Sequence, residues 1–179
     1  MFFSKAGPEN TTQTIELSLK VARERNIEHI VVASNSGSTA RLLKGGGKKT
    51  VCVSHAYGYK DKGQNELSPE VREELRQAGI ETVTASHVLS GVERGISNHS
   101  KGMYPAEIIS NSLRMLGQGM KVCVEISIMA LDAGLIPYGE RIVAIGGTGR
   151  GADTAVIITP RHASEVFGTR IHEVICKPR

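Results

Sequence analysis

Residues 31–43 read VVASNSGSTARLL, and this stretch decides the kind of fold that the sequence forms. It begins with β-branched apolar residues, continues with small polar residues around one glycine, and ends with apolar residues at helical spacing. That succession is typical of a buried strand that turns tightly into a helix. Units of this kind, repeated along a chain, build an α/β fold.

The rest of the chain repeats this alternation of strands and helices. Apolar runs bounded by turn residues predict strands at residues 29–33, 50–53, 80–84, 141–145, 154–159 and 170–176. Apolar residues at helical spacing predict helices at residues 10–26, 39–43, 68–78, 86–97 and 105–116, with Asn10 and Ser68 as N-caps of the first and third. Residues 121–134 alternate like a strand over VCVEISIM, but the continuation into ALDAG favours a buried helix.

This alternation predicts an α/β fold of three layers, with helices on both faces of a mostly parallel sheet. Ligands bind to such sheets beyond the carboxyl ends of the strands. Four segments leave those ends, namely SNSGST, SHAYGYKDKG, SHVLSGVERG and GGTGRGAD, and all four are rich in small or polar residues. The segment KGGGKK falls at the opposite edge. We therefore expect the functional site among the four segments.

The composition indicates one globular domain over residues 1–179. With 40% hydrophobic and 22% charged residues, the chain can bury a sizeable core and is too balanced to be disordered. No apolar stretch approaches the roughly 20 residues of a membrane helix, and MFFSKAGPEN lacks the apolar core of a secretory signal. We expect a cytoplasmic protein with no membrane partner. Cys52, Cys123 and Cys176 stand singly, as small buried residues do.

The net charge of +4 raises the question of nucleic-acid binding. The basic residues gather at expected helix ends and chain ends, as in KGGGKK, where cations complement the helix dipole. With no Trp and only 4% aromatic residues, the chain has little on which bases could stack. We expect no nucleic-acid partner.

The loop SNSGST joins a strand to the start of a helix, where free N–H groups favour an anion. Gly37 allows a tight turn and a close approach to a ligand, and the surrounding hydroxyls are donors. We interpret the loop as a phosphate-binding site made of Ser34, Asn35, Ser36, Gly37, Ser38 and Thr39. The alternative is a simple helix cap by Ser38, which needs one hydroxyl only.

The glycine-rich loop GGTGRGAD fits neither the GxGxxG nor the P-loop pattern, and no helix follows it. Its alternative role is a hairpin connection between two strands. Its four glycines and its arginine exceed what a turn needs, and an arginine can pair with phosphate or cover a planar ring. We assign to the site Gly147, Thr148, Gly149, Arg150, Gly151 and Asp153.

Two further segments, TVCVSHAYG and TVTASHVLSG, each lead a strand into a Ser-His pair at the same edge. This pattern places in the site His55, Tyr57, Gly58, His87 and Gly91. The alternative is a pair of caps with incidental histidines. No HxxxH spacing or carboxylate pair supports a metal, and no GxSxG elbow supports a nucleophile. The other histidines are expected at the surface or at strand edges, and no partner is identified for Glu125, Asp132 or Glu165.

The stretch IVVASNSGSTARLL resembles the effector-phosphate loop of the pyruvate kinase C-terminal domain, and GERIVAIGGTGRGADTAVII is similar to that domain's closing strands. The whole chain resembles the stand-alone archaeal and bacterial relatives of that domain. The resemblance implies a sheet of order 3-2-1-4-5 with the fifth strand antiparallel, and a crevice between strands one and four. It also implies flavin mononucleotide (FMN) as a ligand. Pyruvate kinase activity is not implied, because the catalytic barrel is absent.

Two functions of different class remain open. The first is an FMN-binding protein, for which an oxidoreductase is the natural enzyme class. The alternative is a non-catalytic regulatory module that senses a sugar phosphate or a nucleotide. In both cases the partner is a small phosphorylated molecule. Hydrolysis lacks a nucleophile. A homo-oligomer is also open, because the apolar helix GMKVCVEISIMAL suits a dimer interface as well as a core.

Overall fold

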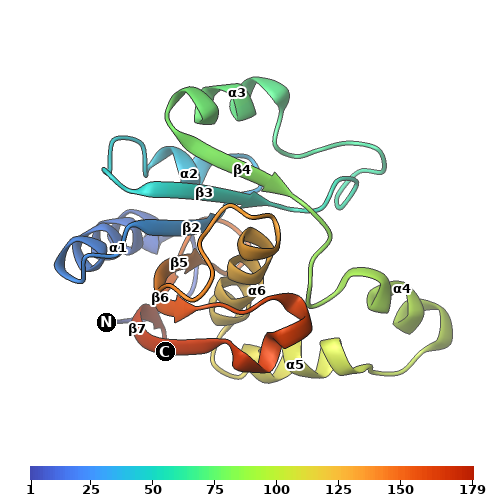
Figure 1. The fold of residues 1–179 in the computed structure, drawn as a ribbon. Helices are drawn as coiled ribbons and strands as arrows, with labels where there is room; N and C mark the ends of the chain where they lie inside the picture. The colour runs from blue at the N-terminus through green and yellow to red at the C-terminus, as the bar shows by residue number, and fades with distance from the viewer.

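One mixed sheet of seven strands, in the order β1-β7-β6-β5-β2-β3-β4, forms the centre of the molecule (Figure 1). The computed structural model describes residues 1–179. The strands are β1 (Phe2–Phe3), β2 (His29–Ala33), β3 (Lys49–Ser54), β4 (Ile80–Thr84), β5 (Ile142–Gly146), β6 (Thr154–Thr159) and β7 (Arg170–Pro178). The helices are η1 (Pro8–Asn10), α1 (Thr11–Glu24), α2 (Ser38–Arg41), α3 (Pro69–Gln77), α4 (Gly91–Ser100), α5 (Pro105–Arg114), α6 (Gln118–Asp132) and η2 (Ala163–Gly168).

The five central strands have the order 3-2-1-4-5 that the resemblance implies, when β2, β3, β4, β5 and β6 are counted as the first to fifth strands. Strands β4, β3, β2 and β5 are parallel, and β6 is antiparallel to β5. Strand β7 then pairs antiparallel with β6, and the short β1 pairs parallel with β7. The α/β fold and its antiparallel fifth strand are therefore confirmed.

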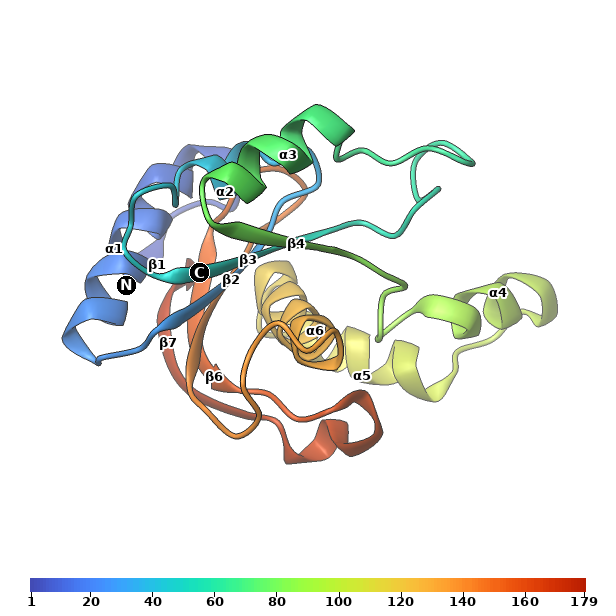
Figure 2. The ribbon, with the colours of Figure 1, turned by 45° about the horizontal axis from the view of Figure 1, so that its top comes forward.

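Helices cover both faces of the sheet and create two apolar cores (Figure 2). Successive side chains of a strand point to opposite faces. Ile30 and Val32 of β2 accordingly join the core beneath α1, α2 and α3, whereas Val31 joins the core beneath α6. Because β2 is buried on both faces, its sequence is continuously apolar, as is usual in parallel sheets.

Helix α6 confirms the helical interpretation of residues 121–134. Twelve of its fifteen residues are buried, and it packs against β5, β6 and β2 on one side and against α5 on the other. This packing within the chain explains its apolar sequence without a second copy. A homo-oligomer stays a prediction. No helix has the length and apolar character needed to cross a membrane.

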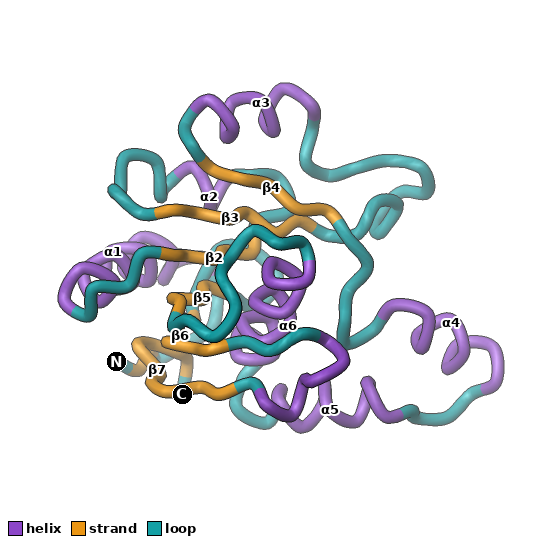
Figure 3. Tube along the Cα trace, in the orientation of Figure 1, coloured by secondary structure: helices purple, strands orange, loops and turns teal.

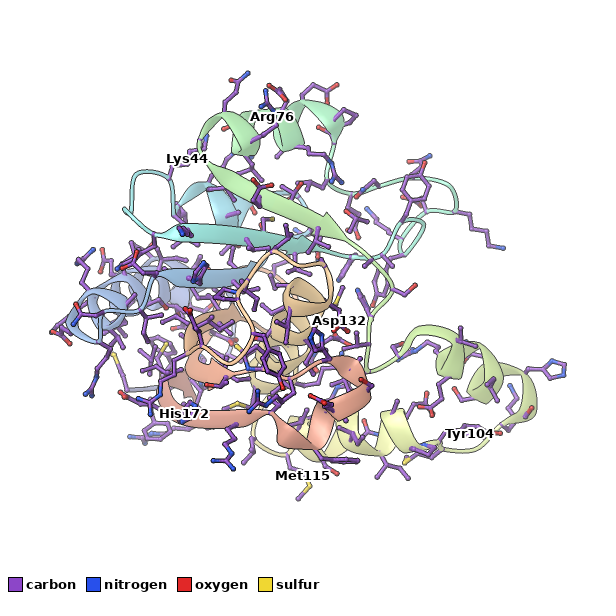
Figure 4. The ribbon with its side chains drawn as sticks, viewed as in Figure 1. Lys44, Arg76, Tyr104, Met115, Asp132 and His172 are labelled. Atoms are coloured by element: carbon purple, nitrogen blue, oxygen red, sulfur yellow. The ribbon has the colours of Figure 1, made fainter.

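Helix α4 projects beyond the sheet, and α5 leads the chain back to α6, against which it packs; the two helices form an arm (Figures 2 and 3). Figure 4 shows Tyr104 at the turn that joins them and Met115 after the end of α5. The prediction of a helix at residues 86–97 is wrong at both ends, because α4 begins at Gly91 and ends at Ser100. The preceding residues form a turn instead, in which the Ser90 N–H donates to the carbonyl oxygen of His87 at 3.1 Å.

Two other predictions near helix starts need correction. Asn10 occupies the N-cap position of α1, but its side-chain amide donates to the carbonyl oxygen of Lys5 at 2.8 Å and caps no helical N–H. The predicted helix 39–43 is only the single turn α2. In contrast, Ser68 caps α3 as predicted, because its hydroxyl accepts from the Val71 N–H at 3.4 Å.

Candidate functional site

A cavity of about 760 Å³ lies at the carboxyl ends of β2, β3 and β5, between the edge loops and helix α6. Its volume is in the range of roughly 300–1,000 Å³ that is usual for small-molecule sites. Strand β2 pairs with β3 on one side and with β5 on the other, so the chain order reverses at this point of the sheet. Such switch points are where α/β sheets bind ligands. The segment KGGGKK leads into the start of β3 and lies at the opposite edge, as predicted.

The first wall of the cavity is the loop SNSGST. The Ser34 hydroxyl is buried and accepts from the N–H groups of Thr39 and Ala40, at 3.1 and 3.4 Å. Ser34, rather than Ser38, therefore caps the single turn α2, and these two N–H groups are already satisfied. The hydroxyls of Ser36 and Ser38 lie 3.3 Å apart on exposed residues. The loop consequently offers hydroxyls to a ligand more than it offers helix N–H groups.

Gly37 adopts a left-handed conformation, with φ of +81°, but it does not line the cavity. A Cβ at this position would overlap Val71 Cγ1 and would lie 3.2 Å from Leu67 Cδ1. Both neighbours belong to α3 or to the residues before it. The glycine is thus required for packing against α3, which differs from the close approach to a ligand that the sequence predicted.

The second wall is the glycine-rich loop between β5 and β6. Its base is held by the N-terminal segment, because the Gly7 N–H donates to Asp153 at 3.1 Å and the Ala152 N–H donates to Thr11 at 3.0 Å. Gly151 packs so closely against this segment that a Cβ at this position would lie 2.8 Å from Pro8 Cα. At the tip, the exposed Arg150 guanidinium has no hydrogen-bond partner in the protein.

The third wall contains three rings, which lie in the segments that follow β3 and β4. The ring centroids of His55 and Tyr59 lie 3.9 Å apart, and those of His55 and His87 lie 5.5 Å apart. The His55 Nδ1 lies 2.6 Å from a carboxylate oxygen of Glu66, which orients the imidazole. Burial lowers the pKa of His87 from its ordinary value of 6.5. The expectation that both histidines lie at one crevice is confirmed.

The floor of the cavity carries a buried ion pair that sequence reasoning missed. Lys121 and Glu125 are four residues apart on one face of α6, and their side chains are only 7% and 6% exposed. The second carboxylate oxygen of Glu125 accepts from the Leu89 N–H at 3.1 Å. The sequence signal was available: a lysine and a glutamate at helical spacing in an otherwise apolar helix. Glu125 therefore has partners, as do Asp132 with His162 and Glu165 with Tyr138.

The cavity wall is also richer in cations than the sequence patterns indicated. Arg94 and Arg114 enter from the arm, and Arg114 is oriented by Gln118 at 2.8 Å and by Ser110 at 2.7 Å. In total, five lysines or arginines and three carboxylates line the cavity. This balance suits an anionic ligand.

Most of the site residues predicted from the sequence line the cavity, and six do not. Those on the wall are Ser34, Asn35, Ser36, Ser38, Thr39, His55, His87, Gly147, Gly149, Arg150 and Gly151. Those away from it are Gly37, Tyr57, Gly58, Gly91, Thr148 and Asp153. Tyr57 is 65% exposed and donates its hydroxyl to the Gly63 carbonyl at 2.7 Å, whereas Tyr59 takes the place that the sequence assigned to Tyr57.

A mixed α/β sheet of this order, with a polar crevice at its switch point, defines a class of α/β ligand-binding domains. Comparison with known families then identifies the chain within that class. The sequence model of the family described as pyruvate kinase, alpha/beta domain, matches residues 12–158. The chain belongs to this family.

Solved structures show a more distant likeness. A pyruvate kinase from Cryptosporidium parvum is 18% identical to this chain, with a TM-score of 0.42, and the same values hold for that enzyme in complex with ADP. A third structure of the enzyme is 17% identical, with a TM-score of 0.39. The match covers 82% of this chain and 22% of those enzymes, so the chain spans about a fifth of their length.

Proposed function

We propose that the protein binds a small phosphorylated molecule with a planar ring in the crevice cavity, and that FMN is the ligand that fits best. The observation that carries this proposal is the composition of one cavity: hydroxyls and an unpaired arginine on one side, and a cluster of rings on the other. The hydroxyls and the arginine can bind a phosphate group, and the ring cluster can stack on an isoalloxazine ring.

The phosphate end of the proposed site is built from Ser36, Ser38 and Arg150. The two hydroxyls lie on exposed residues of their loop, and the arginine has no protein partner that a phosphate would have to displace. An arginine can form two parallel hydrogen bonds with phosphate oxygens. Because α2 has only four residues and Ser34 caps it, side chains rather than a helix dipole would hold the anion.

The ring end of the proposed site is built from His55, Tyr59 and His87. Their centroids lie within 5.5 Å of one another, and Tyr59 is 60% exposed, so its face is available to a flat ligand. Offset stacking and edge-to-face contacts of aromatic rings favour such an arrangement. When bound, a flavin supplies hydride or electron transfer, so an oxidoreductase is the natural enzyme class.

One observation favours the second candidate, a regulatory module that senses a sugar phosphate or a nucleotide without performing chemistry. The glycine-rich loop is tied at its base to the N-terminal segment by Gly7 and Thr11. A ligand that pulled Arg150 inward would therefore act on the residues that lead into α1. That coupling is the physical basis that a sensor requires.

A fluorescence titration with FMN and with riboflavin tests the proposal. Charge-assisted hydrogen bonds to phosphate contribute roughly 1.5 kcal/mol or more, so FMN should bind at least about tenfold more tightly than riboflavin. Equal dissociation constants would remove the phosphate site. A sugar phosphate that stabilises the protein against heat, without any flavin binding, would favour the regulatory module instead.

A further inference from the structure

The pair of Lys121 and Glu125 on the cavity floor has features that a purely structural contact does not need. Both side chains are almost fully buried, in a helix whose other buried residues are mainly apolar. Taking two charges out of water is costly, and apolar residues of similar size often stabilise a core as well or better. The placement of this pair against a ligand-sized cavity therefore points to chemistry.

The hydrogen bonds of the pair leave the lysine free to act on a ligand. Glu125 is held on both oxygens, one by the Leu89 N–H and the other by Lys121. An ammonium has three donors, and Lys121 has only this one protein acceptor. The glutamate is thus fixed. Lys121 lines the cavity and has two donors left without a protein acceptor.

Other groups around the pair oppose the charged form of the amine. Burial lowers the pKa of Lys121 from its ordinary value of 10.5, and the nearby cations Arg114 and Arg94 act in the same direction, against the attraction of Glu125. A lysine in such a setting is the type that serves as a nucleophile toward carbonyl groups.

We propose that Lys121 forms an imine with the carbonyl group of a phosphorylated aldehyde or ketone held in this cavity, with Glu125 as its proton acceptor and donor. The inference rests on the proposed phosphate site, because that site would place such a substrate over α6. It adds a reactive protein group and a substrate class to the cavity that is proposed above to bind a phosphorylated molecule.

The atoms and charges of the step balance without any further reagent. Glu125 takes a proton from the Lys121 ammonium, and the free amine attacks the carbonyl carbon, so that a C–N bond forms and the C=O π bond breaks. The oxygen is protonated through Glu125, which in turn takes the proton that the nitrogen loses. Glu125 then protonates the hydroxyl, which leaves as water. The products are a protonated imine and a carboxylate that again faces a positive charge.

Pyridoxal 5′-phosphate, a phosphorylated aldehyde, is a suitable test compound. The intact protein is treated with a substoichiometric amount, reduced with borohydride and digested, and the adduct is located by mass spectrometry. We expect Lys121 to be labelled faster than Lys60, the exposed lysine at the cavity rim, because burial lowers the pKa of Lys121 and leaves more of its amine free to attack the aldehyde. Labelling of exposed lysines without Lys121 would overturn the proposal.

Three controls separate chemistry from binding. Lys121→Arg keeps the charge beside Glu125 and should lose the adduct, whereas Lys60→Arg should keep it. Glu125→Gln lowers the pKa of Lys121 further, but it removes the acid that expels water, so imine formation should slow while circular dichroism stays unchanged. Pyridoxal, which lacks the phosphate, distinguishes the two proposals: equal rates for both aldehydes at Lys121 would remove the phosphate site and retain the reactive amine. Preferential binding of FMN with no adduct at Lys121 would retain the phosphate site and overturn the reactive amine.

Discussion

The Cβ position of Gly37 overlaps the Cγ1 of Val71, so the loop SNSGST and helix α3 are packed in contact at a residue that has no side chain. The glycine also lies at φ of +81°, a conformation that side chains disfavour. Position 37 therefore needs a glycine for two reasons, the packing against α3 and the backbone conformation. Neither comes from the cavity, which Gly37 does not line.

The variant Gly37→Ala should consequently reduce the free energy of unfolding. Backbone strain at positive φ alone costs about 1–3 kcal/mol, and the overlap with α3 adds to it. Urea denaturation measures the change. Val71→Ala relieves only the overlap, so the double variant should be more stable than the sum of the two single changes predicts. Strict additivity would show that the two residues do not interact.

Removing the Ser34 hydroxyl should destabilise the same loop for a different reason. In Ser34→Ala the buried N–H groups of Thr39 and Ala40 lose their acceptor, and a lost cap costs about 1 kcal/mol. Chemical denaturation should show this loss, whereas Ser38→Ala should leave the midpoint nearly unchanged. If Ser38→Ala were the more damaging change, Ser38 would be the cap.

Arg150 should contribute to affinity and not to stability. Its guanidinium forms no hydrogen bond or ion pair within the protein, so Arg150→Gln should weaken FMN binding about tenfold or more, the cost of about 1.5–3 kcal/mol for a hydrogen bond to a charged group. The matched control is the double change Lys48→Gln and Lys49→Gln at the opposite edge of the sheet, which should leave the same titration unchanged. A larger effect of the lysine pair would place the ligand at that edge.

The two tyrosines of the segment HAYGY should differ in their effect on the ligand. Tyr59 lies in the ring cluster, so Tyr59→Ala should weaken FMN binding about two- to tenfold, because an aromatic pair contributes about 0.5–1.5 kcal/mol. Tyr57 donates to Gly63 within its own loop, and Tyr57→Phe should leave affinity unchanged. Riboflavin should show the same loss with Tyr59→Ala, because the ring and not the phosphate is affected.

Acid should destabilise the protein partly through His87. Burial lowers the pKa of this histidine below 6.5, so the unfolded chain binds its proton more readily than the folded chain does. The free energy of unfolding should therefore fall as the pH drops below about 6.5 toward the lower pKa of the folded state. Above about 6.5 this histidine should cost the protein no stability. Denaturation midpoints at pH 7.5 and pH 5.5 measure the slope. His87→Asn should flatten it, whereas a variant of the exposed His99 should retain the parental slope.

Much of the framework could be predicted from local patterns. Strands β2, β4 and β6 have the predicted bounds, because apolar runs and the turn residues beside them act over a few positions only. The alternation of strands and helices then limits the sheet to few arrangements, since parallel crossovers are right-handed. The edge of the sheet that carries the cavity follows from this alternation, because the loops that leave the carboxyl ends of parallel strands lie at one edge.

The contents of the cavity were less predictable, because they depend on contacts between residues far apart in the chain. Tyr59 rather than Tyr57 joins the rings, as the path of the loop decides which side chain turns inward. Glu125 meets Leu89 across 36 positions, and no local pattern encodes that contact.

The sequence by itself therefore determined the α/β class and the edge at which the loops converge, because these follow from periodicity and chain handedness, and the strand order came from the resemblance of its motifs to a known family. Only the tertiary structure decided what each loop residue does. It showed that Ser34 caps α2, that Gly37 serves the packing of α3, and that Lys121 lies beneath the cavity. The physical reason is that a side chain's role depends on burial and on partners, which exist only once distant segments have packed together.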